Sequence, residues 1–267
     1  MSWTNEMDPY YARLWSSFET GLANRTVLDP RKRLLVAIGV NVVTGETDQV
    51  AKLVTEALAL AVPVAEIHEV LLQATVYAGK PIVNRSLTVF ADVVTSTGHM
   101  AELLHSRLPE QGPNADLDLA RERATWLVSD QDFPRRDEFI DKYGWPAISA
   151  MLSTQPTHKA SGVQDMDKLD DGWTKLWVDF IYTGMYLRRV LDDQTRTLCM
   201  VGECLALQSQ PQAENHMRNA LLLGCTPAEV LEVVFQTSQY VGMPRSLWGR
   251  EILAKIQSER PSKAHAT

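Results

Sequence analysis

The chain has 267 residues, of which 45% are hydrophobic and 22% are charged, an ordinary balance for a folded globular protein. Its formal net charge of -7 argues against a nucleic-acid partner, because such proteins present a basic surface. No run of about 18 apolar residues is present, so we expect no membrane span, and the first residues show no signal-peptide pattern, so we expect a cytoplasmic protein.

The first half of the chain shows helix signals. Asp29 followed by Pro30 predicts a helix start, because aspartate caps a first turn and proline fits its first position. Leucine, valine and isoleucine without strict alternation then predict a helix over 31–43. Gly79 with Pro81 two residues later predicts that a helix stops there.

The middle and the end of the chain continue this pattern. Within 100–165, helices are expected over 117–127 and 137–152, with loops over 111–114 and 153–162. Thr226-Pro-Ala-Glu229 has the pattern of a capping box, and the apolar residues that follow it recur at helical spacing. Gly242 with Pro244 predicts a second helix stop, and the residues after Ile256 form a polar tail. Period-2 alternation is lacking, so the fold class is all-α.

The strongest feature is an internal repeat. Gln73, Tyr77, Gly79 and Pro81 return 163 residues later as Gln236, Tyr240, Gly242 and Pro244, and Arg33 returns at the same offset as Arg196. A repeat of this length indicates a duplicated structural unit. We therefore predict a first helical repeat over 1–99, a helical connector over 100–165, and a second repeat with its polar tail over 166–267.

Cysteine and histidine spacing gives no sign of a metal site or a disulfide framework. Cys199, Cys204 and Cys225 are odd in number and show no CxxC spacing, which is typical of free thiols in a reducing compartment. The histidines form no HxxxH or HExxH pair, and no nucleotide-binding glycine motif is present. We therefore expect neither a metal nor a cofactor.

Both repeats resemble the carboxymuconolactone decarboxylase family. The stretch 66–85 has an acidic helix start that leads into a Tyr-x-Gly-x-Pro turn and then Asn84-Arg85, and His216 begins a His-x-x-x-Ala-x-x-x-Gly run. The resemblance implies two tandem helical units related by an internal pseudo-twofold axis. It also implies a homo-oligomer, either a trimer or a dimer of the fused chain, that acts on a small-molecule substrate without a cofactor.

The resemblance also points to a catalytic pair in the second repeat. In the family this histidine is the acid/base group, and imidazole suits proton transfer near neutral pH, so His216 is the leading candidate. Glu203 lies in an otherwise apolar run, where a carboxylate is costly unless it is paired or functional. The first repeat has Leu53 and Val40 at these positions. If His216 is catalytic, the first repeat has lost its site, and the active site lies in the second repeat.

Four further residues are candidate substrate-binding groups. Arg196 suits a substrate carboxylate, although its recurrence as Arg33 favours a structural ion pair. Gln236 and Tyr240 lie four residues apart on one helix, where both can face a pocket, and the recurrence of the tyrosine favours core packing. Trp173 either lines the cavity or fills the core, and we favour the core.

Three functions follow from these features. The first is a cofactor-independent lyase that decarboxylates a carboxylated lactone or related cyclic acid. The second is a tailoring isomerase or lyase on a larger aromatic or polyketide product, and the third is a non-catalytic assembly protein with decayed sites. Thiol peroxidase chemistry is disfavoured, because relatives of that kind carry a Cys-x-x-Cys pair where this chain has Ser209 and Gln212, and a glutamate where it has Thr197.

Overall fold

The computed structural model describes residues 8–105, 138, 140–144, 170–188 and 190–259. Every regular element in these ranges is a helix, which confirms the predicted all-α class. Among the described helices, none combines the length and the apolar character that crossing a membrane requires. The helices predicted over 117–127 and 137–152 and the loops of the connector lie outside the described residues, except for Glu138 and the short turn η3 (Ile140–Gly144).

The two repeats have matching helices at a constant spacing. In the second repeat α14 (Asp193–Ala206), α15 (Gln210–Leu222) and α17 (Met243–Glu259) begin 163 residues after their counterparts in the first repeat, α3 (Pro30–Thr44), α4 (Thr47–Ala59) and α7 (Lys80–Ser96). The segment formed by α5 (Val64–Gln73) and α6 (Thr75–Ala78) corresponds in the same way to a single helix, α16 (Pro227–Val241). The predicted internal pseudo-twofold repeat is therefore present in the fold.

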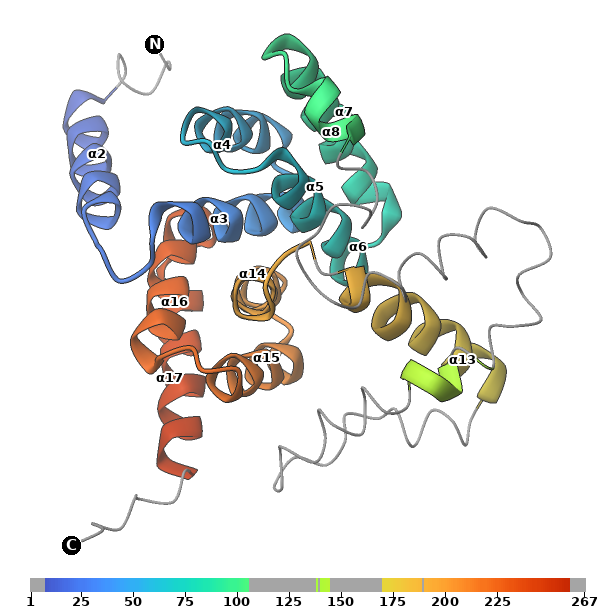
Figure 1. Ribbon diagram of the computed structural model, residues 1–267. Coiled ribbons are helices and arrows are strands. Elements are labelled where there is room, and N and C mark those ends of the chain that lie inside the picture. Colours follow the sequence, from blue (N-terminus) through green and yellow to red (C-terminus); the bar gives the residue numbers. More distant parts are fainter. Residues whose placement is uncertain (1–7, 106–137, 139, 145–169, 189, 260–267) are drawn as a thin grey trace, which may run out of the picture.

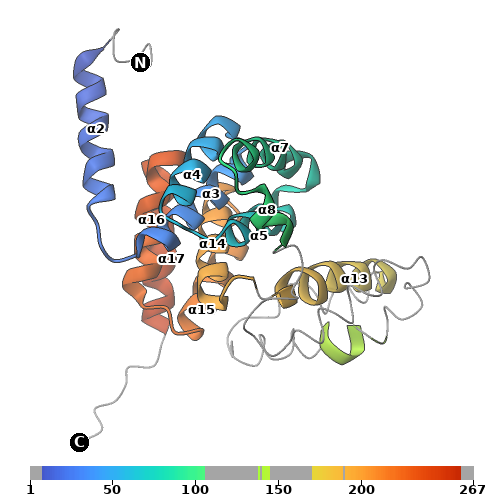
Figure 2. The same ribbon diagram turned by 45° about the horizontal axis from the view of Figure 1, so that its top comes forward.

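Further helices extend these two sets. In the first repeat α2 (Pro9–Ala23) comes before these helices, and α8 (Met100–His105), which lies within the predicted connector, follows them. The second begins with α13 (Asp171–Val178), which continues into the wider turns of η4 (Asp179–Met185) and the 3₁₀ turn η5 (Tyr186–Arg188). In both views α2 stands away from the other helices (Figures 1 and 2). Only Leu22 of α2 is buried.

Helix ends follow the predicted signals. The Asp29 side chain accepts a hydrogen bond from the Lys32 N–H at 2.9 Å. Thr226 and Glu229 form the expected capping box. Gly79 and Gly242 end their helices with φ of 76° and 90°, a region in which glycine avoids the penalty that a Cβ incurs. Each glycine is followed at once by a new helix, because the proline two residues later fits a first helical turn.

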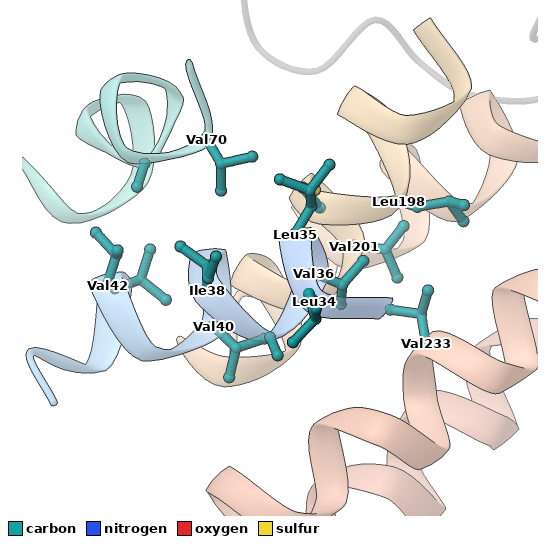
Figure 3. Close-up of a cluster of buried hydrophobic side chains, with 14 of the residues drawn as sticks. Leu34, Leu35, Val36, Ile38, Val40, Val42, Val70, Leu198, Val201 and Val233 are labelled. Atoms are coloured by element: carbon teal, nitrogen blue, oxygen red, sulfur yellow. The ribbon is translucent and has the colours of Figure 1, made fainter. Parts of the chain in front are cut away.

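The central element of the fold is the pair α3 and α14, which pack against each other (Figure 1). Residues 34–43 of α3 and 195–206 of α14 are all buried. A helix that is buried on every face belongs in the middle of a core, which explains why α3 shows little amphipathic pattern. Figure 3 shows side chains of α3 meeting those of α5, α14 and α16, for example Ile38, Val70 and Val233.

Glycines allow the two central helices to approach each other. Gly39 of α3 and Gly202 of α14 are equivalent in the repeat. A Cβ added to Gly202 would lie 3.0 Å from Val40 Cγ2, and one added to Gly39 would lie 2.6 Å from Glu203 Oε1 and 3.3 Å from Val70 Cγ1. The close crossing therefore places the Glu203 carboxylate directly against the backbone of α3.

We expect Gly39→Ala to lower the free energy of unfolding by about 1–3 kcal/mol, because the added methyl overpacks a buried crossing and Glu203 has no solvent into which to move. Gly21→Ala is the matched control. Nothing lies within 4 Å of a Cβ at Gly21, so this change should be neutral or stabilise the chain by up to about 1 kcal/mol. Urea unfolding of both variants measures the difference, and equal stability would contradict the packing argument.

Candidate active site

A buried polar cluster lies where the second repeat meets the first. Arg196 and Glu203 are seven residues apart on α14, which puts them on one face two turns apart. His216 comes from α15, whereas Gln73 ends α5 and Tyr77 lies on α6. The cluster therefore combines helices from both repeats, and neither repeat contains it alone.

Arg196 anchors one end of the cluster through Glu69. Its Nη2 donates to Glu69 Oε1 at 2.8 Å, and its Nη1 donates to Gln73 Oε1 at 3.2 Å. The second oxygen of Glu69 accepts from Arg188 Nε at 2.7 Å. Only Nε of Arg196 has no hydrogen-bond partner among the described residues. Arg196 therefore forms a structural ion pair. Only one of its nitrogens has no partner in the described part of the chain, whereas bidentate binding of a substrate carboxylate requires two.

Glu203 is a buried carboxyl group with a raised pKa. Its side chain is fully buried, and among the described residues Arg196 is the one cationic group that affects its titration. Burial raises the pKa of Glu203 to about 8, although a hydrogen bond from Gln73 and the charge of Arg196 oppose the shift. Oε1 accepts from Gln73 Nε2 at 3.3 Å, and Oε2 has no partner among the described residues. At neutral pH the group is mainly a carboxylic acid with one oxygen unpaired.

His216 is held by a tyrosine of the other repeat. Its Nε2 lies 2.8 Å from the Tyr77 hydroxyl, and the two rings meet edge to face. The Tyr186 hydroxyl is 3.5 Å from that of Tyr77. Burial lowers the pKa of His216 to about 4, so the ring is neutral at pH 7. Nδ1 has no partner among the described residues, so either tautomer of the ring leaves this nitrogen unpaired.

The cysteines of this region are poorly suited to thiolate chemistry. Cys199, Cys204 and Cys225 are all free and buried. Burial, together with the charge of Glu203, raises the pKa of the Cys204 thiol well above its usual value, and burial raises that of Cys225 to about 11. A reactive thiol needs a lowered pKa. In the described ranges, no group of three or more His, Cys, Asp or Glu side chains is arranged to hold a metal ion.

The other predicted site residues lie elsewhere. Gln236 and Tyr240 line a cavity of about 400 Å³ on the opposite side of the pseudo-twofold, where they join Arg33, the counterpart of Arg196. Trp173 is 49% exposed and stacks on Trp177 with ring centroids 6.5 Å apart. Arg196 and Glu203 thus share Gln73 as a hydrogen-bond partner, and His216 bonds Tyr77, which lies one turn after Gln73. Gln236, Tyr240 and Trp173 form no hydrogen bond with these groups among the described residues.

Sequence reasoning did not assign a role to Gln73, Tyr77, Tyr186 or Glu69 in this cluster. Gln73 and Tyr77 were visible as repeat residues, but they are the first-repeat counterparts of Gln236 and Tyr240. The missing fact was that each site joins the glutamine and tyrosine of one repeat to the arginine of the other. The repeat alignment matches equivalent residues of the two repeats, and it does not show which residues of one repeat contact the other.

Comparison with known proteins agrees with this architecture. A profile of the carboxymuconolactone decarboxylase family matches the chain twice, over residues 9–92 and 172–255. A search of curated proteins found no match. The two matched segments cover α2 to most of α7 and α13 to most of α17, so each holds one set of repeated helices. The chain belongs to the carboxymuconolactone decarboxylase family, with one family unit in each repeat.

Proposed function

We propose that this chain is a cofactor-independent lyase that decarboxylates a carboxylated lactone or a related cyclic acid, with Glu203 and His216 as its acid and base. One observation carries the proposal. Two buried polar atoms of one cluster, Glu203 Oε2 and His216 Nδ1, have no partner among the described residues. Unpaired buried groups destabilise a fold, and such groups with shifted pKa values are characteristic of functional sites.

The protonation states suit loss of carbon dioxide. In this reaction the bond between the ring carbon and the carboxylate carbon breaks, and its electron pair moves into the adjacent carbonyl system as an enolate. Glu203, protonated at neutral pH, gives its proton to the substrate carbon. Neutral His216 then accepts a proton from solvent and passes it to the Glu203 carboxylate, which restores both groups to their starting states. Tyr77 fixes the imidazole ring through Nε2 and leaves Nδ1 free for this transfer.

The test is the loss of 4-carboxymuconolactone on incubation with the purified chain. We expect His216→Ala to lower kcat/KM by about 10²–10⁴-fold, the usual effect of a general acid or base. Tyr77→Phe should also lower the rate, whereas Tyr240→Phe, the same change at the equivalent position across the pseudo-twofold, should not. If the wild type does not consume this lactone, that substrate is excluded. If His216→Ala keeps full activity, the catalytic assignment is wrong.

The pH profile provides an independent check. The acid must be protonated and the base neutral, so kcat/KM should fall above about pH 8, as Glu203 loses its proton, and below about pH 4, as His216 gains one. In Glu203→Gln any residual rate should lose the alkaline limb and keep the acidic one. An unchanged alkaline limb in this variant would assign that limb to another group.

A further inference from the structure

The cavity on the first-repeat side has the dimensions of a ligand site. Its volume of about 400 Å³ falls within the usual range for small-molecule pockets, about 300–1,000 Å³. It lies between the end of α2, α3, α4 and α16. Its apolar wall is formed by Leu34, Ala37 and Leu53, all buried, with Leu60 at the edge.

The polar side of this cavity carries two free carboxylates. Glu19 of α2 and Glu56 of α4 both line it, both are exposed, and neither side chain forms a hydrogen bond or ion pair within the described residues. Both charges act on Tyr240: burial and then Glu56 and Glu19 raise the pKa of the hydroxyl, and the charge of Arg33 opposes the shift. Both carboxylates therefore line the same cavity as the Tyr240 ring.

The cation of the cavity, Arg33, is bonded to the backbone rather than to a carboxylate. Arg33 Nη1 donates to the backbone carbonyl oxygens of Ala23 at 2.6 Å and Arg25 at 3.3 Å, which ties the guanidinium to the turn between α2 and α3. Arg33 forms no ion pair with either carboxylate among the described residues. Among the described residues, Glu19 and Glu56 thus form no ion pair, and the two negative charges outnumber the single positive charge of Arg33 in the lining of the cavity.

The repeat provides an internal comparison for these charges. The counterpart of Glu56 in the second repeat is Asn219, and the residues that can align with Glu19 are Ile181 and Tyr182, so neither carboxylate has an acidic counterpart. Conversely, the cavity has Leu53 in place of His216. The two carboxylates therefore occur only in the cavity on the first-repeat side. This cavity has no imidazole at the position of His216, which the proposed chemistry needs.

We propose that this cavity is a second, non-catalytic ligand site that binds a small organic amine, with the ammonium group between Glu19 and Glu56 and an apolar body against Tyr240 and Leu53. An ammonium group gains ion pairs with the carboxylates and a cation–π contact with the ring. The apolar body removes the leucine and alanine wall from water. This site is independent of the proposed lyase activity, because it shares no residue with the His216 cluster.

Phenethylamine is a suitable probe, since it joins an ammonium group to an aromatic body of fitting size. Titration calorimetry of the full chain at low ionic strength should show saturable binding. 3-Phenylpropanoate, which has a similar body and the opposite charge, should not bind. The double variant Glu19→Gln/Glu56→Gln should raise the Kd for phenethylamine at least about tenfold, because the ammonium loses both charged partners.

Two controls separate this site from general electrostatics and from the lyase site. Glu251→Gln removes an exposed carboxylate on α17, outside the cavity, and should leave the Kd unchanged. His216→Ala should also bind phenethylamine as the wild type does. The proposal is overturned if the wild type shows no saturable binding, if the double variant binds as tightly as the wild type, or if 3-phenylpropanoate binds equally well.

Discussion

Glu203→Gln should make the protein more stable at alkaline pH. In the unfolded chain this carboxyl loses its proton near its ordinary pKa of about 4.5, whereas in the folded chain it keeps the proton until about pH 8. Between these values the folded state binds more protons than the unfolded state, so rising pH destabilises the fold. Glutamine has no proton to lose and keeps an acceptor for Gln73. We expect the stability advantage of the variant to grow by about 3 kcal/mol between pH 5 and pH 8.

Urea unfolding of the wild type and Glu203→Gln at pH 5, 6, 7 and 8 measures this effect. His216 contributes an opposite dependence, because its pKa falls from 6.5 to about 4 on folding and stability is lost as the pH drops through that window. Both proteins share that contribution, so their difference isolates Glu203. The same variant should lose lyase activity, which is the usual conflict between stability and function at a catalytic site. A difference that stays flat with pH would show that Glu203 is ionised in the fold.

The second large effect on stability is expected at Glu69, whose carboxylate binds both Arg196 and Arg188. Glu69→Gln leaves the side chain of Arg196, 4% exposed, and that of Arg188, 30% exposed, without their negative partner. Removing one member of a buried ion pair leaves an uncompensated charge and costs about 3–5 kcal/mol. We expect a loss of this size in the free energy of unfolding, measured by urea denaturation at neutral pH.

The pseudo-twofold supplies the control for this prediction. Glu232 is the counterpart of Glu69 and binds Arg25, the counterpart of Arg188, at 2.7 Å. The Arg25 side chain is 40% exposed, and Arg33 makes no bond to Glu232, so Glu232→Gln exposes no buried cation. This variant should lose only about 1 kcal/mol. Equal losses in the two variants would mean that burial of Arg196 is not the cause.

The helices and their repeat could be predicted from sequence because their signals are local. Asp29 with Pro30, and Thr226 with Glu229, are capping patterns that act within one turn, and the structure confirms both. The offset of 163 residues follows from identities such as Gln73 with Gln236. Glycine followed by proline two residues later was interpreted only as a stop, although the same proline begins the next helix in the structure.

The composition of the cluster could not be predicted in the same way. Glu203 and His216 stood out because their counterparts, Val40 and Leu53, differ from them. Gln236 and Tyr240 were candidates because they lie four residues apart on one helix of the second repeat, whereas the structure places Tyr77 of the other repeat against the imidazole. Which helix faces which is decided by the packing of α3 on α14 through Gly39 and Gly202, and periodicity along one helix does not encode that crossing.

Each site is built from helices of both repeats, and this affects how the two sites can diverge. In a symmetric pair of separate identical subunits, every substitution appears at both sites at once, so the sites cannot diverge. Covalent linkage removes this restriction, because residue 53 and residue 216 are separate positions in one gene product. A charge on one side, such as that of Glu56, needs no equivalent on the other side, where Asn219 occupies the matching position. One chain can therefore combine two dissimilar sites around a single axis, as a heterodimer does.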